Sequence, residues 1–179
     1  SIPSLEPKSF NNDSQTFYVS KINPSADNAV SISFWNPNPK NIKDTALLKL
    51  FVAVFRSNFY HQIRIAQQLC YYCQMGTDFN NGNHILTLFI QSPKDCTILN
   101  EKLVEFIENC KFSGDLNKFK NQILPRSFYT SNAEANIIWK NLLWSNSIIQ
   151  SLIDSITHQE FTEFLSTLAT RPRITVKVC

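Results

Sequence analysis

Residues 71–92 read YYCQMGTDFNNGNHILTLFIQS, and this stretch decides the fold class because it predicts a β-hairpin. Two strand patterns, 71–78 and 85–92, flank a short polar loop. In that loop, the Asn81-Gly82 pair favours the positive φ angles that a tight hairpin turn needs. Strands joined in this way are antiparallel, so the chain is expected to contain an antiparallel sheet.

Three further strands are predicted outside the hairpin, at residues 16–21, 29–35 and 173–178. Within 29–35, Val30, Ile32 and Phe34 alternate with serines. This alternation is typical of a strand with one buried and one polar face. The sheet is therefore expected to be covered on one side only.

Helices are predicted wherever apolar residues recur three or four positions apart. They cover residues 42–55, 59–69, 93–110, 115–124, 133–143, 145–156 and 157–168. Asn41 and Thr157 are the predicted N-caps, and Thr157 forms a capping-box pattern with Glu160. Long helices with few, hairpin-joined strands indicate an α+β fold, a mostly antiparallel sheet covered on one face by helices. Residues 1–15 are predicted to be an N-terminal arm or linker, and residues 16–179 a single domain.

Composition limits the classes of function. Hydrophobic residues make up 43% of the 179, which is enough for a packed core. The net charge is only +3 and the 17 Lys and Arg are spread along the chain, so nucleic-acid binding is not expected. No membrane span and no signal peptide are expected either, because the sequence has neither a long apolar run nor an apolar start. The five cysteines, an odd number, favour reduced thiols and an intracellular setting.

Side chains that could carry chemistry within the chain are few. The histidines, His61, His84 and His158, are far apart, and neither H-E-x-x-H nor H-x-x-E-H occurs, so no metal site is expected in this chain. His84 is expected to be a sheet residue and His158 a solvated residue at a helix start. Cys70 and Cys73 form a C-x-x-C, but it leaves a helix and enters a strand. A reactive pair needs the opposite direction, so two thiols in or near the core are expected.

A longer pattern surrounds the hairpin. Residues 58–71 read NFYHQIRIAQQLCY, and the hairpin that follows them ends in FIQS at 89–92. This arrangement resembles the insulinase/pitrilysin family of inverzincin metallopeptidases, whose C-terminal half carries F-x-x-L-R-T-K-E-Q-L-G-Y before a hairpin ending in I-Q-S. Arg64 and Tyr71 stand at the family's seven-residue spacing. The chain departs from the pattern at Gln67, where the family has Glu, and at Cys70, where it has Gly.

Two later segments extend the resemblance. Residues 157–165, THQEFTEFL, resemble the family's late T-x-E-D-x-x-x-F-Y helix, and residues 173–178 resemble its closing strand. Together the matches run from about residue 16 to residue 178 and resemble the last of four homologous repeats. The resemblance therefore implies that the chain is part of a larger multi-repeat protein.

The resemblance also implies which parts of the active site lie in this chain and which lie in other repeats. In the family, the zinc, its ligands and the general-base Glu lie in the first repeat, and the two halves of the molecule close around the peptide. The present chain would then be a C-terminal domain that binds no zinc and is not catalytic alone. Its partners would be the other repeats or a zinc-bearing subunit, and peptide substrate. Tyr71 would donate a hydrogen bond to the carbonyl oxygen that becomes negative in the transition state, and Arg64 would hold substrate carbonyls. The hairpin would form a wall of the substrate chamber.

Two alternatives remain open. The first is a non-catalytic scaffold or protein-interaction domain with the same fold, which the departures at Gln67 and Cys70 favour. The second is an independent thiol oxidoreductase that uses Cys70 and Cys73. That activity requires a lowered thiol pKa, which the strand context argues against.

Overall fold

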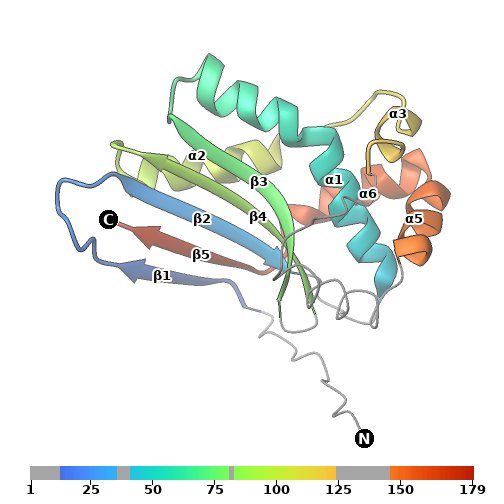
Figure 1. Ribbon diagram of the computed structural model, residues 1–179, viewed down its shortest axis with the longest axis horizontal. Coiled ribbons are helices and arrows are strands. Elements are labelled where there is room, and N and C mark those ends of the chain that lie inside the picture. The colour runs from blue at the N-terminus through green and yellow to red at the C-terminus, as the bar shows by residue number, and fades with distance from the viewer. Residues whose placement is uncertain (1–12, 36–40, 81–82, 124–145) are drawn as a thin grey trace, which may run out of the picture.

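A five-stranded mixed sheet forms one layer of the structure (Figure 1). The computed structural model describes residues 13–35, 41–80, 83–123 and 146–179. The strands are β1 (Gln15–Val19), β2 (Asn28–Trp35), β3 (Tyr72–Asn80), β4 (Asn83–Ser92) and β5 (Arg173–Val178). Their spatial order is β1-β5-β2-β4-β3, and every neighbouring pair is antiparallel except β1 with β5. The predicted fold class, α+β with a mostly antiparallel sheet, is confirmed.

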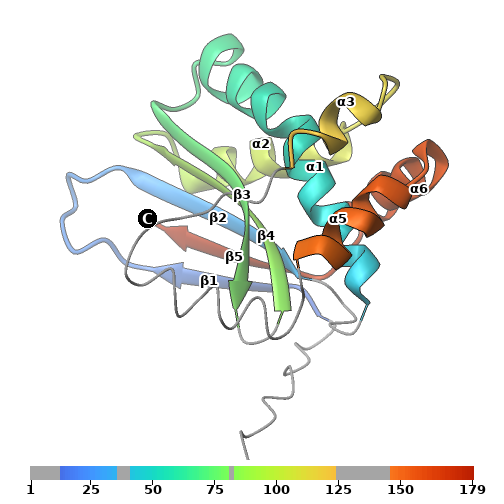
Figure 2. The same ribbon diagram turned by 45° about the vertical axis from the view of Figure 1, so that its right-hand side comes forward.

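The helices lie on one side of this sheet (Figure 2). They are α1 (Ile42–Tyr60), the π-helix η1 (His61–Ala66), α2 (Cys96–Glu108), α3 (Asn117–Lys120), α5 (Asn146–Ser155) and α6 (His158–Leu168). Helix α1 packs on β3 and β4, α2 packs on β2 and β4, and α5 packs on α1. The predicted helix at 133–143 lies outside the described residues.

Three predicted helix boundaries are wrong. Residues 42–55 and 59–69 do not form two helices, because α1 runs without a break to Tyr60 and continues as η1. Helix α2 begins at Cys96 and not at 93, because the Asp95 side chain accepts a hydrogen bond from the Thr97 amide at 2.7 Å and caps the helix there. Helix α3 covers only four residues of the predicted 115–124. The capping box of Thr157 and Glu160 is confirmed at the start of α6.

The core lies between the sheet and the helices. The inward side chains of the two central strands are fully buried: Val30, Ile32 and Phe34 of β2, with Leu86, Leu88 and Ile90 of β4. Phe55 of α1 lies 6.4 Å from Phe161 of α6, so aromatic contacts join the two helices. A buried ion pair also reaches α1 from the loop after α6, because Arg171 contacts both carboxylate oxygens of Asp44, at 2.6 and 2.8 Å.

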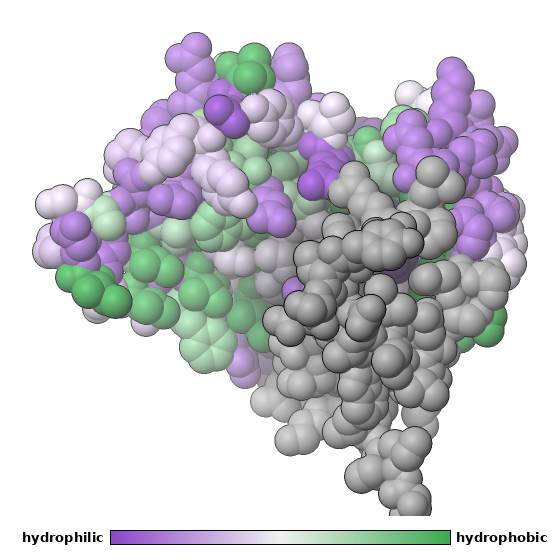
Figure 3. Space-filling view, in the orientation of Figure 1, coloured by the Kyte–Doolittle hydropathy of each residue, from purple (hydrophilic) through white to green (hydrophobic). Residues whose placement is uncertain are grey.

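The other side of the sheet, which we call the open face, carries the alternate residues of each strand. Over β3 and β4 its side chains are mainly polar or aromatic, such as Tyr72, Gln74 and Asp78. Over β1 and β5 they are apolar, and Phe17 and Val19 are about half exposed. Figure 3 shows these apolar side chains gathered on the β1 side of the molecule. The open face therefore has a polar half beside β3 and an apolar half beside β1.

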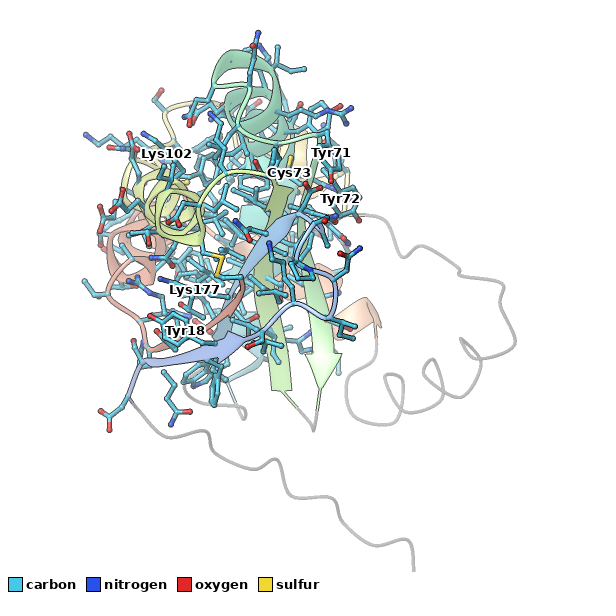
Figure 4. All side chains as sticks on the ribbon, turned by 90° about the vertical axis from the view of Figure 1, so that its left-hand side faces the viewer. Tyr18, Tyr71, Tyr72, Cys73, Lys102 and Lys177 are labelled. Carbon is cyan, nitrogen blue, oxygen red and sulfur yellow. A yellow bond between two sulfur atoms is a disulfide. The ribbon has the colours of Figure 1, made fainter. Side chains whose placement is uncertain are left out.

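A disulfide bond joins Cys96 and Cys179 (Figure 4). It connects the start of α2 to the residue after β5. The expectation of five reduced thiols is therefore wrong for this pair, and the inference of an intracellular setting loses the observation on which it rested. Cys70, Cys73 and Cys110 are free thiols. Separately, none of the described helices has both the length and the apolar character needed to cross a bilayer.

Candidate functional site

The segment from Leu69 to Tyr71 is held by the end of β4. The hydroxyl of Ser92 is completely buried and donates a hydrogen bond to the Leu69 carbonyl at 2.7 Å. Next to it, the Gln91 side-chain amide donates to the Tyr71 hydroxyl oxygen at 3.4 Å. The two sequence blocks that carry the family resemblance, 58–71 and 89–92, therefore meet through these hydrogen bonds.

Tyr71 lies immediately before β3 and is 52% exposed. Because its oxygen accepts the hydrogen bond from Gln91, the phenol hydrogen remains able to donate to another group. Figure 4 shows Tyr71 and Tyr72 together at the start of β3, well separated from Tyr18 and Lys177 on the β1 side. Tyr71 is thus an exposed hydrogen-bond donor beside the polar half of the open face.

Arg64 lies in η1, the π-helical continuation of α1, and its side chain is exposed. Its guanidinium carbon is 5.2 Å from the centre of the Tyr60 ring, a cation–π contact that orients the charge. Burial raises the pKa of both thiols beside Tyr71, and the Arg64 charge acts in the opposite direction on each of them. Arg64 and Tyr71 therefore present a cation and a neutral donor in the same region.

The chain turns sharply between these two residues. After η1, Gln68 has a φ of 46°, in the left-handed region that side chains other than Gly rarely adopt. The last π-type bond runs from the Gln67 amide to the Gln62 carbonyl, and the Leu69 amide then donates to the Ile63 carbonyl, six residues earlier, at 3.0 Å. This turn places Tyr71 at the head of β3 and leaves Arg64 on the preceding helical turn.

Cys70 and Cys73 do not form a reactive redox pair. Burial, followed by the neighbouring Cys73, raises the pKa of the Cys70 thiol to about 12. Burial also raises the pKa of Cys73, and it outweighs the lowering effects of Cys70 and Arg64. Both thiols are therefore protonated at neutral pH, whereas a nucleophilic cysteine needs a lowered pKa. The expectation of two thiols in or near the core is confirmed.

His84 and His158 lie where the sequence predicted. His84 is a buried residue of β4, and His158 is the exposed first residue of α6, with its ring 5.7 Å from that of Phe112. Within residues 13–35, 41–80, 83–123 and 146–179, no group of three His, Cys, Asp or Glu could hold a metal ion. These described side chains therefore do not fit a zinc ion.

A groove runs between α1 and the edge strand β3. Its volume is about 760 Å³, and Arg56 and Tyr60 of α1 line it together with Gln74 and Gly76 of β3. Sequence reasoning did not identify Tyr60, Gln91 or Ser92 as parts of the site. The family pattern contains the signal for the last two, because its I-Q-S triplet falls on residues 90–92.

Known proteins share the fold of this chain. Residues 50–127 match the family model of the C-terminal lobe domain 4 of PqqF-like PQQ synthases. The solved structure of pitrilysin superposes with a TM-score of 0.72 over 94% of this chain, at 17% sequence identity. The chain has the fold of an M16 peptidase domain. A Helicobacter pylori protease gives a TM-score of 0.70 over 94% of the chain at 13% identity, and the inactive domain of an M16 peptidase from Pseudomonas fluorescens gives 0.64 over 93% at 14%.

This chain spans less than half the length of these relatives. It covers 20% of the pitrilysin chain, 45% of the H. pylori chain and 43% of the P. fluorescens chain. A search of curated proteins found no match. The family match and the superpositions support an insulinase-family C-terminal domain, so the resemblance seen in the sequence is confirmed.

Proposed function

We propose that this chain is the C-terminal, non-zinc-binding domain of an insulinase-type metalloendopeptidase. In this proposal it encloses peptide substrate and supplies Arg64 and Tyr71 to an active site whose zinc lies in another repeat or subunit. The observation that carries the proposal is the Tyr71 hydroxyl, which is exposed and accepts from Gln91, so that its hydrogen can be donated. The fold shared with larger M16 peptidases supports the presence of other repeats.

Tyr71 would act on the charge that develops during peptide hydrolysis. Attack on an amide carbonyl places negative charge on its oxygen, and a fixed donor stabilises this charge more than it stabilises the ground state. Removal of one such donor costs about 2.7–4 kcal/mol, or about 10²–10³-fold in kcat. Tyr71 would therefore lower the barrier without forming a bond to the substrate.

Arg64 would position the peptide rather than the reacting oxygen. Its planar guanidinium carries several donors in a fixed fork, which suits the carbonyls of an extended backbone. The Tyr60 ring beneath the guanidinium limits the directions in which it can point. Replacement by Lys would keep the charge but lose the fork, so we expect Arg64→Lys to raise KM more than it lowers kcat.

The test uses the full-length parent protein and its zinc-bearing repeat or subunit. We expect the wild type to contain zinc and to cleave a fluorogenic peptide. Tyr71→Phe should keep the zinc and lose most of its kcat, whereas Tyr18→Phe, a matched change of an exposed tyrosine on β1, should cleave like the wild type. If Tyr71→Phe cleaves as fast as the wild type, the role in transition-state stabilisation is refuted.

A second candidate is a non-catalytic scaffold domain with the same fold. One specific observation favours it, the similarity to a domain that is described as inactive in the P. fluorescens protein. The sequence departures at Gln67 and Cys70 point in the same direction. A parent protein that contains no zinc and cleaves no peptide would support the scaffold and contradict the peptidase.

A further inference from the structure

The groove between α1 and the edge strand β3 is lined on its helical side by one face of α1. Lys49, Val52, Arg56 and Tyr60 recur there at spacings of three and four residues, so they lie along one line of the helix surface. The volume of about 760 Å³ is within the range of ligand sites. The groove therefore extends along about three turns of α1.

The opposite wall of the groove is the outer edge of β3. This strand pairs with β4 from Tyr72 to Asn80, and no other described strand pairs with it. An edge strand presents backbone N–H and C=O groups to which an extended peptide can bind as an added strand. Gly76 lines the groove, and a Cβ atom added there would meet no heavy atom within 4 Å. Another backbone therefore has room to approach β3 at this residue.

The charge in the groove favours an acidic occupant. Arg56 is exposed, and no hydrogen bond or ion pair joins it to another described residue. The described lining residues include a second basic residue, Lys49, and no Asp or Glu. A guanidinium binds a carboxylate through two parallel N–H groups, which gives direction as well as charge. Arg56 is therefore suited to bind a Glu or Asp side chain that enters the groove.

The groove is continuous with the residues of the proposed active site. Tyr60 lines the groove, and its ring centre lies 5.2 Å from the guanidinium carbon of Arg64. Arg56 stands one helical turn before Tyr60, about 6 Å along the axis, and two residues of an extended peptide span that distance. A peptide whose carbonyls are held by Arg64 therefore reaches Arg56 when it continues along β3.

We propose that this groove binds the peptide substrate as an added strand on β3, with an acidic side chain of the peptide against Arg56. The inference rests on the proposed function, because the occupant is the peptide that the domain encloses. It adds a substrate class, namely peptides that carry Glu or Asp at a fixed distance from the cleaved bond. Arg56 would thus select the peptide, whereas Tyr71 would act on the reacting oxygen.

The test measures binding of fluorescein-labelled peptides to the full-length parent protein by anisotropy, with a zinc chelator present to stop cleavage. The peptides are identical except that one position carries Glu, Gln or Lys, and this position is moved along the peptide. At one position, Glu is expected to bind about two- to fivefold more tightly than Gln, the effect of one exposed ion pair. Raising the ionic strength should reduce this preference, because salt screens exposed charges.

Two variants of Arg56 assign the preference to this side chain. Arg56→Gln should remove the preference for Glu, and Arg56→Glu should reverse it, so that the Lys peptide binds most tightly. Both variants change an exposed helix residue, so their unfolding temperatures should stay close to that of the wild type. Arg173→Gln removes the same charge from β5, which β2 and β4 separate from β3, and should leave the preference unchanged.

Peptides with N-methylated backbones test the mode of binding. N-methylation removes one N–H group, and in an added strand only every second N–H of the peptide faces its neighbour. Methylation at alternate positions should therefore weaken binding, whereas methylation at the positions between them should not. Equal losses at consecutive positions would contradict the addition of a strand to β3.

The outcomes separate this inference from the function on which it rests. Equal binding of the Glu, Gln and Lys peptides at every position by the wild type would overturn the acidic-residue groove and leave peptide enclosure standing. A Glu preference that persists in both Arg56 variants would also overturn it. If the Glu preference is found but the zinc-loaded parent cleaves no peptide, the groove stands and the peptidase proposal fails. If no peptide binds to the wild type, both fail.

Discussion

The buried hydroxyl of Ser92 donates a hydrogen bond to the Leu69 carbonyl, and this bond fixes the segment that carries Tyr71. The Ser92 hydroxyl oxygen also accepts a hydrogen bond from the Lys94 amide at 3.2 Å, so this one side chain is hydrogen-bonded to two separate parts of the backbone. The hairpin end and the helix end thus form one structural unit. Displacement of either would move the proposed transition-state donor.

Ser92→Ala should destabilise the domain because it leaves the Leu69 carbonyl buried without this partner. We expect a loss of about 1–3 kcal/mol in the free energy of unfolding, measured by urea denaturation. Ser166→Ala removes a comparable hydroxyl from the exposed face of α6 and is the matched control, with little expected change. Equal losses in the two variants would contradict a special role for Ser92.

The ion pair between Arg171 and Asp44 should matter more than the pairs at the surface. The exposed fraction of the side chain is 14% for Arg171 and 8% for Asp44, and the guanidinium also lies 4.8 Å from the centre of the Phe164 ring. Asp44→Asn would leave the Arg171 charge largely buried without its partner, so a loss of about 3–5 kcal/mol is expected in thermal or urea unfolding.

The comparison for this prediction is the exposed pair of Lys102 and Glu105 on α2. Glu105→Gln should cost less than about 1 kcal/mol, because water screens that pair. If Asp44→Asn lowered the free energy of unfolding by no more than Glu105→Gln does, burial would not strengthen the ion pair of Arg171 and Asp44.

Acid should weaken the start of α6 through Glu160. The hydrogen bond from Lys43, followed by those from Thr157, lowers the pKa of this carboxyl from 4.5 to about 2. Because the folded-state pKa is depressed, the stabilising effect is complete above about pH 4.5 and is lost as the pH falls toward 2. Glu160→Gln should therefore be less stable than the wild type at neutral pH and equal to it near pH 2.

The measurement is the unfolding temperature of the wild type and Glu160→Gln across this pH range. Gln can keep the hydrogen bond of the capping box, so the difference between the curves reports the charge. Parallel curves with no convergence in acid would contradict the assignment to Glu160.

The disulfide bond should contribute a large share of the stability. Cys96 and Cys179 are 83 residues apart, and closing a loop of that length lowers the conformational entropy of the unfolded chain, which stabilises the folded state by up to about 4.5 kcal/mol. Cys179→Ser should lower the unfolding temperature, and dithiothreitol should do the same to the wild type but not to the variant. Cys110→Ser, at a free thiol, should retain the response to dithiothreitol.

Local patterns in the sequence predicted most of the fold. The alternation in β2, the antiparallel pairing of β3 with β4 and the capping box at Thr157 each depend on nearby residues, and each lies where it was predicted. The continuation of α1 into η1 was not predicted. The spacing of apolar residues changes in a similar way at a π-helical turn and at the end of a helix, so the sequence pattern does not distinguish the two. The disulfide was missed because cysteine spacing does not determine which residues fold together.

The candidate site was predictable only in part. The seven-residue spacing of Arg64 and Tyr71 came from a family pattern, and their roles remain predictions. The contact of Tyr60 with Arg64 and the hydrogen bonds of Gln91 and Ser92 depend on how a helix end meets a hairpin end. The groove between α1 and β3 depends on side chains from both elements, so no single segment of the sequence reveals it.

The position of β5 has a consequence for synthesis of the chain. β5 lies between β1 and β2, so residues 173–178 join the first described strand to the rest of the sheet. On the ribosome, β1 has no partner in this sheet until the last strand has emerged. Contacts so distant in sequence form slowly, and exposed strand edges favour aggregation in the meantime. Nascent chains of this domain should therefore depend on chaperones until residue 178 is free.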